Sequence, residues 1–350
     1  MENIKETVAK LKPSIDKAIE KNIPRKFSGA QLARIAGKPR YAYDETSITE
    51  ALAKPIWNLL DRGGKRLRPA LTLITIEALG KNPKKFLDFA AIPEIIHSGT
   101  LLTDDIQDDS INRRGKPCIH RIYGNDIAIN AGSAMYFLPF KIVMESALLD
   151  KKRNALYEAM SQELINVSIG QGMDIYWHKG LSKENVTEKE YLQMCAYKTG
   201  CLMRMSVKIG GILADATPKQ LQALSEFAEA IGIAFQIQDD ILNLTGGKEF
   251  KKDKGEDISE GKITLMVIRA LKRSPRAKRL EEILKKHTKD QHDIAEAIGI
   301  IRESGAIDYA KSFSQSIVEK AWAKLDKTLP NNSGKTKLKA LAEYSVERDN

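Results

Sequence analysis

Two long apolar segments of this chain each end in a pair of adjacent aspartates. Apolar residues on several faces indicate helices buried in a bundle, where an acid without a partner is costly. Since successive helical residues lie about 100° apart, acids four residues apart share one face, with roughly 40° between them. Such groups of carboxylates are typical ligands of hard divalent cations. The acidic residues are Asp104, Asp105 and Asp108 after the first segment, and Asp239 and Asp240 after the second.

The remaining sequence predicts helices and almost no strands. β-branched residues occur singly within patterns of helical period, and no Asn-Gly or Asp-Gly turn joins two alternating runs. We therefore predict an all-α fold. The expected helices span residues 4–22, 46–61, 67–80, 86–109, 126–149, 152–176, 187–213, 218–242, 261–272, 275–287, 291–303 and 305–328.

The 350 residues contain no Pro/Gly/Ser-rich linker, so we expect one large domain over residues 1–350. Residues 23–45, with two prolines and two tyrosines, are predicted to be irregular, and residues 331–350 to form a frayed tail.

Composition restricts the possible partners and the compartment. The net charge of +10 is spread along the chain, which argues against a nucleic-acid-binding stripe. Three cysteines without CxxC spacing predict neither a disulfide framework nor a zinc site, and they favour a reducing compartment. We find no secretory signal and no long apolar run, so we expect a cytoplasmic protein without stable membrane insertion.

Basic residues accompany the acids. Arg113 and Arg114 follow the first group, and a guanidinium binds phosphate oxygens directly, whereas carboxylates bind them only through a metal. The segment 63–69, Gly-Gly-Lys-Arg-Leu-Arg-Pro, places cations at a helix start but lacks P-loop spacing. Each element alone would more often be a solvated surface cluster. Together they indicate a metal-bridged diphosphate site.

The ordered motifs GGKRLRP, DDIQDDSINRRGKP, GQGMDIYW, YKTG and FQIQDDILN, followed by GEDISEGKITL, resemble the trans-isoprenyl diphosphate synthases, most closely the geranylgeranyl diphosphate synthases. The resemblance covers roughly residues 46–270. It implies a single helical bundle around a central cavity, the isoprenoid synthase fold, in a homodimer or higher homo-oligomer. It also implies the Mg²⁺-dependent head-to-tail condensation of isopentenyl diphosphate with an allylic diphosphate (dimethylallyl, geranyl or farnesyl diphosphate).

The resemblance assigns roles residue by residue. The catalytic residues would be the five aspartates, as Mg²⁺ ligands, and Lys198. The allylic diphosphate would contact Arg113, Lys198, Thr199, Gln236, Lys252 and Lys262. Isopentenyl diphosphate would be bound by Lys65, Arg68, His97 and Arg114. His97 would otherwise be read as a core histidine. The chain departs from the family pattern at Asn243, where many members carry a third aspartate; we therefore expect the second group to depend chiefly on Asp239.

Product length would depend on side chains near the first acidic group. Small residues stand at the fourth and fifth positions before Asp104, where farnesyl-forming relatives carry aromatics, so we expect a twenty-carbon product. The expected chain-length residues are Gly99, Thr100, Ile96, Tyr136 and Phe137. A twenty-five-carbon product or farnesyl diphosphate is the alternative.

The sequence leaves three alternative functions to be weighed. A non-catalytic subunit of a heteromeric synthase tends to lose one acidic motif, and both are present here. A terpene cyclase would use similar acids without the elements for a second diphosphate. Nucleic-acid binding rests on the net charge alone.

Overall fold

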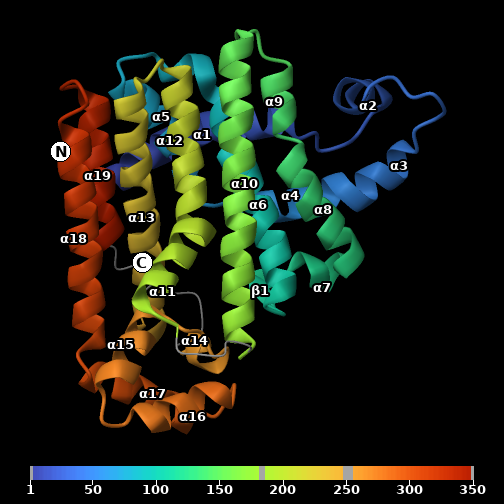
Figure 1. Cartoon of the computed structure of the whole chain (residues 1–350). Helices are drawn as coiled ribbons and strands as arrows, with labels where there is room; N and C mark the ends of the chain where they lie inside the picture. Colours follow the sequence, from blue (N-terminus) through green and yellow to red (C-terminus); the bar gives the residue numbers. More distant parts are fainter. Residues whose placement is uncertain (1–2, 181–185, 247–254, 348–350) are drawn as a thin grey trace. The chain divides into compact units, whose positions relative to one another are not determined.

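Helices make up nearly all of the structure, a computed structural model that describes residues 3–180, 186–246 and 255–347 (Figure 1). Within these residues the strands are β1 (Asn112–Arg113) and β2 (Lys116–Pro117), which form one antiparallel pair. The predicted all-α fold is confirmed.

Contacts divide the chain into two compact units. The first contains Met1–Ser161, Met205–Ala216 and Pro330–Lys337, and the second contains Gln162–Arg204, Thr217–Leu329 and Leu338–Asn350. The single domain expected from the sequence stays a prediction, and each unit is described by itself.

The first unit is built around α6, whose buried residues include Ile92, Ile95 and Ile96. Helices α1, α5 and α8 pack against it. The elements of this unit are α1 (Ile4–Asn22), α2 (Gly29–Ala36), α3 (Glu45–Ile48), the π-helix η1 (Thr49–Ala53), α4 (Lys54–Leu60), α5 (Leu67–Ala78), the 3-10 helix η2 (Pro83–Phe86), α6 (Leu87–Gln107), α7 (Ile119–Tyr123), α8 (Asn125–Phe137) and α9 (Phe140–Met144).

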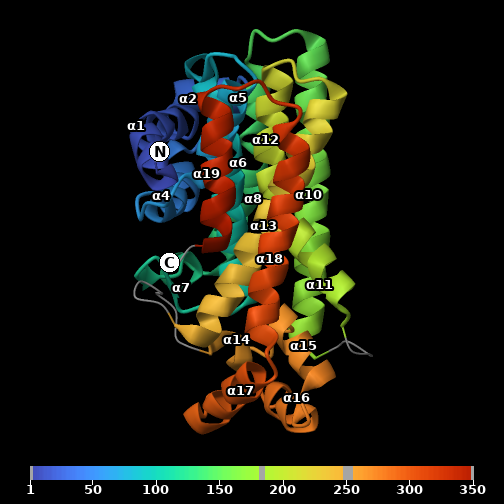
Figure 2. The ribbon, with the colours of Figure 1, turned by 90° about the vertical axis from the view of Figure 1, so that its left-hand side faces the viewer.

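The second unit is organised around α13 and α18, which run side by side (Figures 1 and 2). Its elements are α11 (Glu188–Cys195), the π-helix η3 (Ala196–Gly200), α13 (Pro218–Thr245), α14 (Glu256–Ser259), α15 (Leu265–Arg273), α16 (Ala277–Lys285), α17 (Gln291–Glu303) and α18 (Ala306–Asp326). Three helices have residues in both units: α10 (Asp150–His178), α12 (Cys201–Leu213) and α19 (Ser333–Glu347).

Two expectations about irregular segments are wrong. Residues 23–45 contain α2, which begins at a reciprocal cap between Ser28 and Gln31. The tail forms α19 through Glu347 instead of fraying. This helix is held in the first unit by Asn332, whose amide donates to the backbone oxygen of Ala78 (3.0 Å). In the second unit Leu338 and Leu341 on α19 are fully buried.

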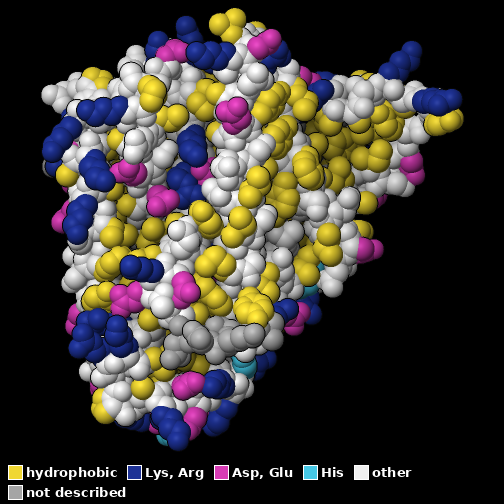
Figure 3. Space-filling view, in the orientation of Figure 1, with side chains coloured by type: hydrophobic (Ala, Val, Ile, Leu, Met, Phe, Trp, Pro, Cys, Tyr) yellow, Lys and Arg dark blue, Asp and Glu magenta, His cyan; other side chains and the backbone are white. Residues whose placement is uncertain are grey.

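The helix expected over residues 126–149 is divided. Helix α8 ends at Phe137, and α9 begins at Phe140 after a turn at Leu138 and Pro139. Among the described residues, the stretch Asn125–Met144 is long and apolar enough to cross a membrane by length and composition, and 39% of its most apolar window is buried. Exposed apolar side chains, including Ile129, Phe137 and Met144, gather on these two helices (Figure 3).

Candidate functional site

The first acidic group lies at the end of α6. Asp104 and Asp105 occupy its last turn, and Asp108 is the residue that caps its C-terminus. The Asp105 side chain is 1% exposed, and its Oδ1 accepts a hydrogen bond from Arg113 Nε (2.7 Å). Arg113 Nη2 also lies 3.7 Å from Asp104 Oδ2. The short helical spacing therefore places the two carboxylates beside one guanidinium.

The carboxylates of this group fit the divalent cation that the family resemblance implies. Asp105 Oδ2 is buried, and no hydrogen-bond donor among the described residues reaches it. Such an oxygen has lost its hydrogen bonds to water and gained no bond in exchange. A hard cation bound to it would compensate for that loss. Among the described side chains, no three of Asp, Glu, His and Cys lie close enough to form a metal site by themselves. The aspartates would therefore act together with diphosphate oxygens.

The two basic motifs of the first unit lie against each other. Arg114 (φ 53°) and Gly115 (φ 76°) form the two-residue turn between β1 and β2, a hairpin conformation that usually requires Asn-Gly. The turn directs Arg114 toward the Gly63–Arg66 loop, where its Nη1 donates to Gly63 O. A Cβ atom on Gly64 would lie 3.1 Å from Arg114 Nη2, so the absence of a side chain permits this approach.

His97 lies near the same cations. Burial, followed by the charges of Arg68 and Arg114, holds the pKa of His97 well below its usual value. The imidazole is therefore neutral at neutral pH and can donate one hydrogen bond. The structure thus gathers Arg68, His97 and Arg114, three of the four residues expected to bind isopentenyl diphosphate. The fourth, Lys65, is exposed on the adjoining loop.

The residues expected to set product length lie where α6 crosses α8. Gly99 permits this crossing, because a Cβ there would lie 2.8 Å from Met135 Cβ and 2.9 Å from Gly132 O. Tyr136 bonds Thr103 through their hydroxyls (2.9 Å). Ile96 is fully buried and Thr100 partly buried, whereas Phe137 is 70% exposed. Adjacent helical residues point about 100° apart, so Tyr136 faces α6 and Phe137 does not.

In the second unit, Lys198 and Thr199 lie on the π-helix η3, which interrupts the helix that continues from α11 into α12. Glycines allow both neighbouring helices to approach it. A Cβ on Gly170 of α10 would lie 2.4 Å from Lys198 N, and one on Gly232 of α13 would lie 2.4 Å from Gly200 Cα. The helix predicted over residues 187–213 is thus interrupted by an inserted residue of π-helix. π-Helical insertions are frequent at functional sites.

Polar side chains form a chain from η3 to the second acidic group. Lys198 Nζ donates to Asp174 Oδ2 (2.6 Å), and Thr199 Oγ1 donates to Gln236 Oε1 (2.8 Å). Gln236 Nε2 in turn donates to Asp240 Oδ1 (2.8 Å). Tyr191 completes the set, because its hydroxyl donates to Asp240 Oδ2 (2.7 Å). Three side chains expected to contact the allylic diphosphate (Lys198, Thr199 and Gln236) and one expected metal ligand (Asp240) are thereby held in one local arrangement. Asp174 and Tyr191, which were not expected, belong to it as well.

The two aspartates of the second group differ. Asp239 is exposed, whereas Asp240 is 5% exposed. Burial, together with the nearby carboxylate of Asp257, raises the pKa of Asp240 to about 7. A buried carboxylate next to a second carboxylate is costly as an anion, and a divalent cation would offset that cost. The group therefore fits a cation as the first group does.

Asn243 has a structural role. It is 2% exposed, and its Oδ1 accepts from the backbone N–H of Asp257 (3.2 Å). The amide therefore ties α13 to the start of α14 and accepts a backbone hydrogen bond where a third carboxylate would bind metal. Lys262 lies 3.5 Å from Asp257 Oδ1 and 2.5 Å from Glu260 Oε2. Lys252 lies outside the described residues.

Several residues of the site were missed from the sequence. Asp174 belongs to the GQGMDIYW motif but received no role, and Tyr191 has no recognisable motif. Glu94, 3% exposed, could have been noticed because it is an acid within the apolar run of α6, the same signal that revealed the aspartates.

Known proteins resemble this chain over most of its length. The chain matches the polyprenyl synthetase family over residues 49–301. It is 35% identical to a geranylgeranyl diphosphate synthase of Methanosarcina mazei, over 86% of this chain and 90% of that one. It is also 35% identical to a geranylfarnesyl diphosphate synthase of Aeropyrum pernix, over 88% and 98%. The crystal structure of a geranylgeranyl pyrophosphate synthetase from Pyrococcus horikoshii has a TM-score of 0.85, 31% identity, and coverage of 99% and 98%.

Proposed function

The chain belongs to the polyprenyl synthetase family, and from this premise we propose that it condenses isopentenyl diphosphate with an allylic diphosphate to give geranylgeranyl diphosphate. The observation that carries the proposal is that candidate metal-binding acids and phosphate-binding cations lie together. Asp104 and Asp105 lie beside Arg113, and Arg114 bonds the backbone of the glycine-rich loop at Gly63. The prenyltransferase family and the isoprenoid synthase fold are supported by the relatives and by the solved structure.

In the reaction, the bond between C1 and oxygen of the allylic diphosphate breaks and diphosphate leaves. The double bond of isopentenyl diphosphate forms a new carbon–carbon bond with the allylic carbon. A proton is then lost to the released diphosphate, so no nucleophilic side chain is required. Preorganised cations aimed at the departing charge would provide most of the catalysis.

Side chains of each unit have defined tasks in this proposal. In the first unit, Lys65, Arg68, His97 and Arg114 bind the diphosphate of isopentenyl diphosphate, and Arg113 contacts the allylic diphosphate. In the second unit, Lys198, Thr199, Gln236 and Lys262 contact the allylic diphosphate. The residues that would hold Mg²⁺ are Asp104, Asp105, Asp108, Asp239 and Asp240. When bound, Mg²⁺ would supply positive charge to diphosphate oxygens.

The twenty-carbon product is supported by the small residues Gly99 and Thr100 before the first acidic group. The geranylfarnesyl synthase of Aeropyrum pernix makes twenty-five carbons the nearest alternative. Exposed apolar side chains on α8 and α9 support a homo-oligomer, because large apolar patches usually mark interfaces. Three free, buried cysteines support a reducing compartment, the cytoplasm.

The test is a product assay. Purified protein with Mg²⁺, labelled isopentenyl diphosphate and each allylic diphosphate should yield mainly a twenty-carbon diphosphate. Asp104→Asn and Asp239→Asn should each abolish turnover. Mainly farnesyl diphosphate would refute the proposed product, and turnover retained by both variants would refute the role of the aspartates. No turnover by the chain alone would favour a non-catalytic subunit.

A further inference from the structure

Arg66 is a buried cation that the proposed chemistry does not use. It is 4% exposed and stands in the motif between Lys65 and Arg68. Its backbone is left-handed (φ 53°), a conformation that is uncommon for residues other than glycine and requires support from its surroundings. Arg66 is also the residue before the first turn of α5. Its position therefore fixes how the loop enters this helix.

Each nitrogen of the Arg66 guanidinium has a partner. Nε donates to Asp16 Oδ1 (2.7 Å), Nη1 to Glu94 Oε1 (2.8 Å) and Nη2 to Leu60 O (3.3 Å). Asp16 comes from α1 and Glu94 from α6, so the arginine joins two helices to the loop that carries it. Buried arginines are tolerated when their charge and donors are matched in this way.

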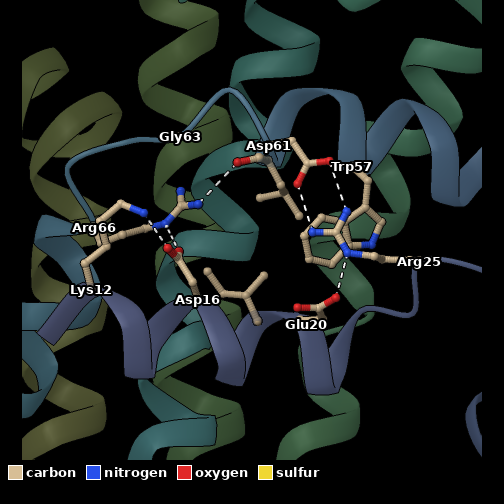
Figure 4. Close-up of a pocket in the computed structure, with 10 residues that line it drawn as sticks. Lys12, Asp16, Glu20, Arg25, Trp57, Asp61, Gly63 and Arg66 are labelled. Carbon is tan, nitrogen blue, oxygen red and sulfur yellow. Dashed lines mark hydrogen bonds and ion pairs between the residues drawn. The ribbon is translucent and has the colours of Figure 1, made fainter.

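Asp16 lies at a cavity of about 160 Å³ in the first unit (Figure 4). Figure 4 shows Arg66 extending from the loop toward Asp16 on α1. The cavity is also lined by a second arginine, Arg25, which lies over the Trp57 ring and bonds Glu20 and Asp61. The cavity is thus bordered by two separate arginine–carboxylate pairs, of which only the Arg66 pair reaches the diphosphate-binding loop.

The segment that carries Arg66 also carries Lys65 and Arg68, which are expected to bind isopentenyl diphosphate. A Cβ on Gly64 would lie 3.0 Å from Arg66 Nη1 and 3.1 Å from Arg114 Nη2, so the two guanidinium groups flank the same glycine. Like charges this close repel each other unless anions compensate them. Asp16 and Glu94 supply that compensation to Arg66.

We propose that Asp16 is a positioning residue for the isopentenyl diphosphate site. Asp16 holds Arg66 in its left-handed conformation and thereby sets the placement of Lys65 and Arg68. Its negative charge also reduces the repulsion between Arg66 and Arg114. The inference rests on the proposed function, and it extends the site to α1, outside the residues 49–301 that match the family. Asp16 is partly exposed, at 34% of its side chain, so its substitution should leave the fold intact.

The experiment compares Asp16→Asn with a matched control, Glu20→Gln. Glu20 lies four residues later on α1 and bonds Arg25 Nε (2.6 Å) in place of Arg66. We expect Asp16→Asn to raise the KM for isopentenyl diphosphate by about tenfold, which corresponds to about 1.4 kcal/mol. The KM for the allylic diphosphate and kcat should stay within twofold. Asp16→Glu should restore most of the loss, and Glu20→Gln should behave as the wild type.

Calorimetric binding of isopentenyl diphosphate without an allylic substrate separates this inference from the proposed function. If the wild type binds isopentenyl diphosphate but does not turn over, and Asp16→Asn binds it about tenfold more weakly, the positioning role stands and the proposed function fails. Equal binding by the wild type and Asp16→Asn overturns the inference. So does an equal loss in Asp16→Asn and Glu20→Gln, since that would show a general effect of α1.

Discussion

Replacing Gly170 with alanine should separate α10 from the π-helix η3 and reduce catalysis. The new Cβ would lie 2.4 Å from Lys198 N and 2.7 Å from Tyr197 C. Both are backbone atoms, so no change of rotamer can relieve the contact. Ordinary van der Waals contact begins at 3.4 Å, and η3 must therefore move by about 1 Å relative to α10.

The structure allows the size of the effect to be estimated. Replacing glycine with alanine in a helix stabilises the folded state by about 1 kcal/mol, whereas overpacking of this kind destabilises it by about 1–3 kcal/mol. Stability should therefore fall by no more than about 2 kcal/mol, and the variant should fold. A displacement of about 1 Å in a catalytic group can reduce the rate about 100-fold. Because Lys198 moves with η3, we expect kcat to fall by up to about 100-fold, a larger effect than the loss of stability.

Steady-state kinetics and urea unfolding of Gly170→Ala would measure both effects. The control is Gly172→Ala on the same helix, where a Cβ would have no atom within 4 Å. It should gain the helix propensity of alanine, about 1 kcal/mol, and keep wild-type kinetics. Gly170→Ala with a kcat within twofold of the wild type would refute the reasoning, because Lys198 would then not depend on this contact.

Three further predictions concern other parts of the chain. Glu163→Gln should lower the free energy of unfolding in urea by about 3 kcal/mol, because Glu163 is fully buried against Arg204 (2.8 Å). Adding Arg204→Met to this variant should restore part of the stability, and a double variant whose loss equals the sum of the two single losses would contradict the pairing. Burial and the surrounding arginines lower the pKa of His97, so below about pH 6.5 His97 is protonated in the unfolded chain and not in the folded one. The free energy of unfolding should therefore decrease as the pH is lowered, by up to about 1.4 kcal/mol per pH unit. In His97→Gln, unfolding measured between about pH 5 and 7 should show a shallower fall. Thr100→Phe should shorten the product detected by chromatography, with Thr100→Ser as the control, whereas Gly99→Phe would collide with α8 and disturb folding.

Local patterns in the sequence predicted much of the fold. Helix α1 begins and ends where expected, and α13 begins at Pro218 as expected, with Thr217 as its N-cap. The break between α8 and α9 was missed although Pro139 stands in the middle of the predicted helix 126–149, where a proline removes a backbone hydrogen bond and interrupts the helix. Helix α19 was missed although its buried residues Leu338, Leu341 and Ala342 stand at helical spacing, because the polar composition of the segment was read as a frayed tail.

The site was predictable where the chemistry is local. Asp105 and Arg113 are eight residues apart, so the motif indicated that they lie near each other, although their direct hydrogen bond was not predicted. The pairing of Arg66 with Asp16 spans 50 residues and depends on how α1 packs, which no spacing rule specifies. Asn243 could be recognised as a departure from the family pattern, but its bond to Asp257 required the path of the backbone.

The π-helix η3 also restricts how this sequence can change in length. A π-helical segment contains one residue more than the regular helix needs, and each residue turns the helix by about 100°. Deleting any one residue of Ala196–Gly200 would let α11 continue into α12 as ordinary α-helix, with better backbone hydrogen bonds. It would also rotate every residue on one side of the deletion away from its present neighbours. Lys198 would lose Asp174, or Arg204 would lose Glu163. Insertions and deletions tolerated elsewhere on the surface should therefore be absent from these five residues in any functional descendant of this chain.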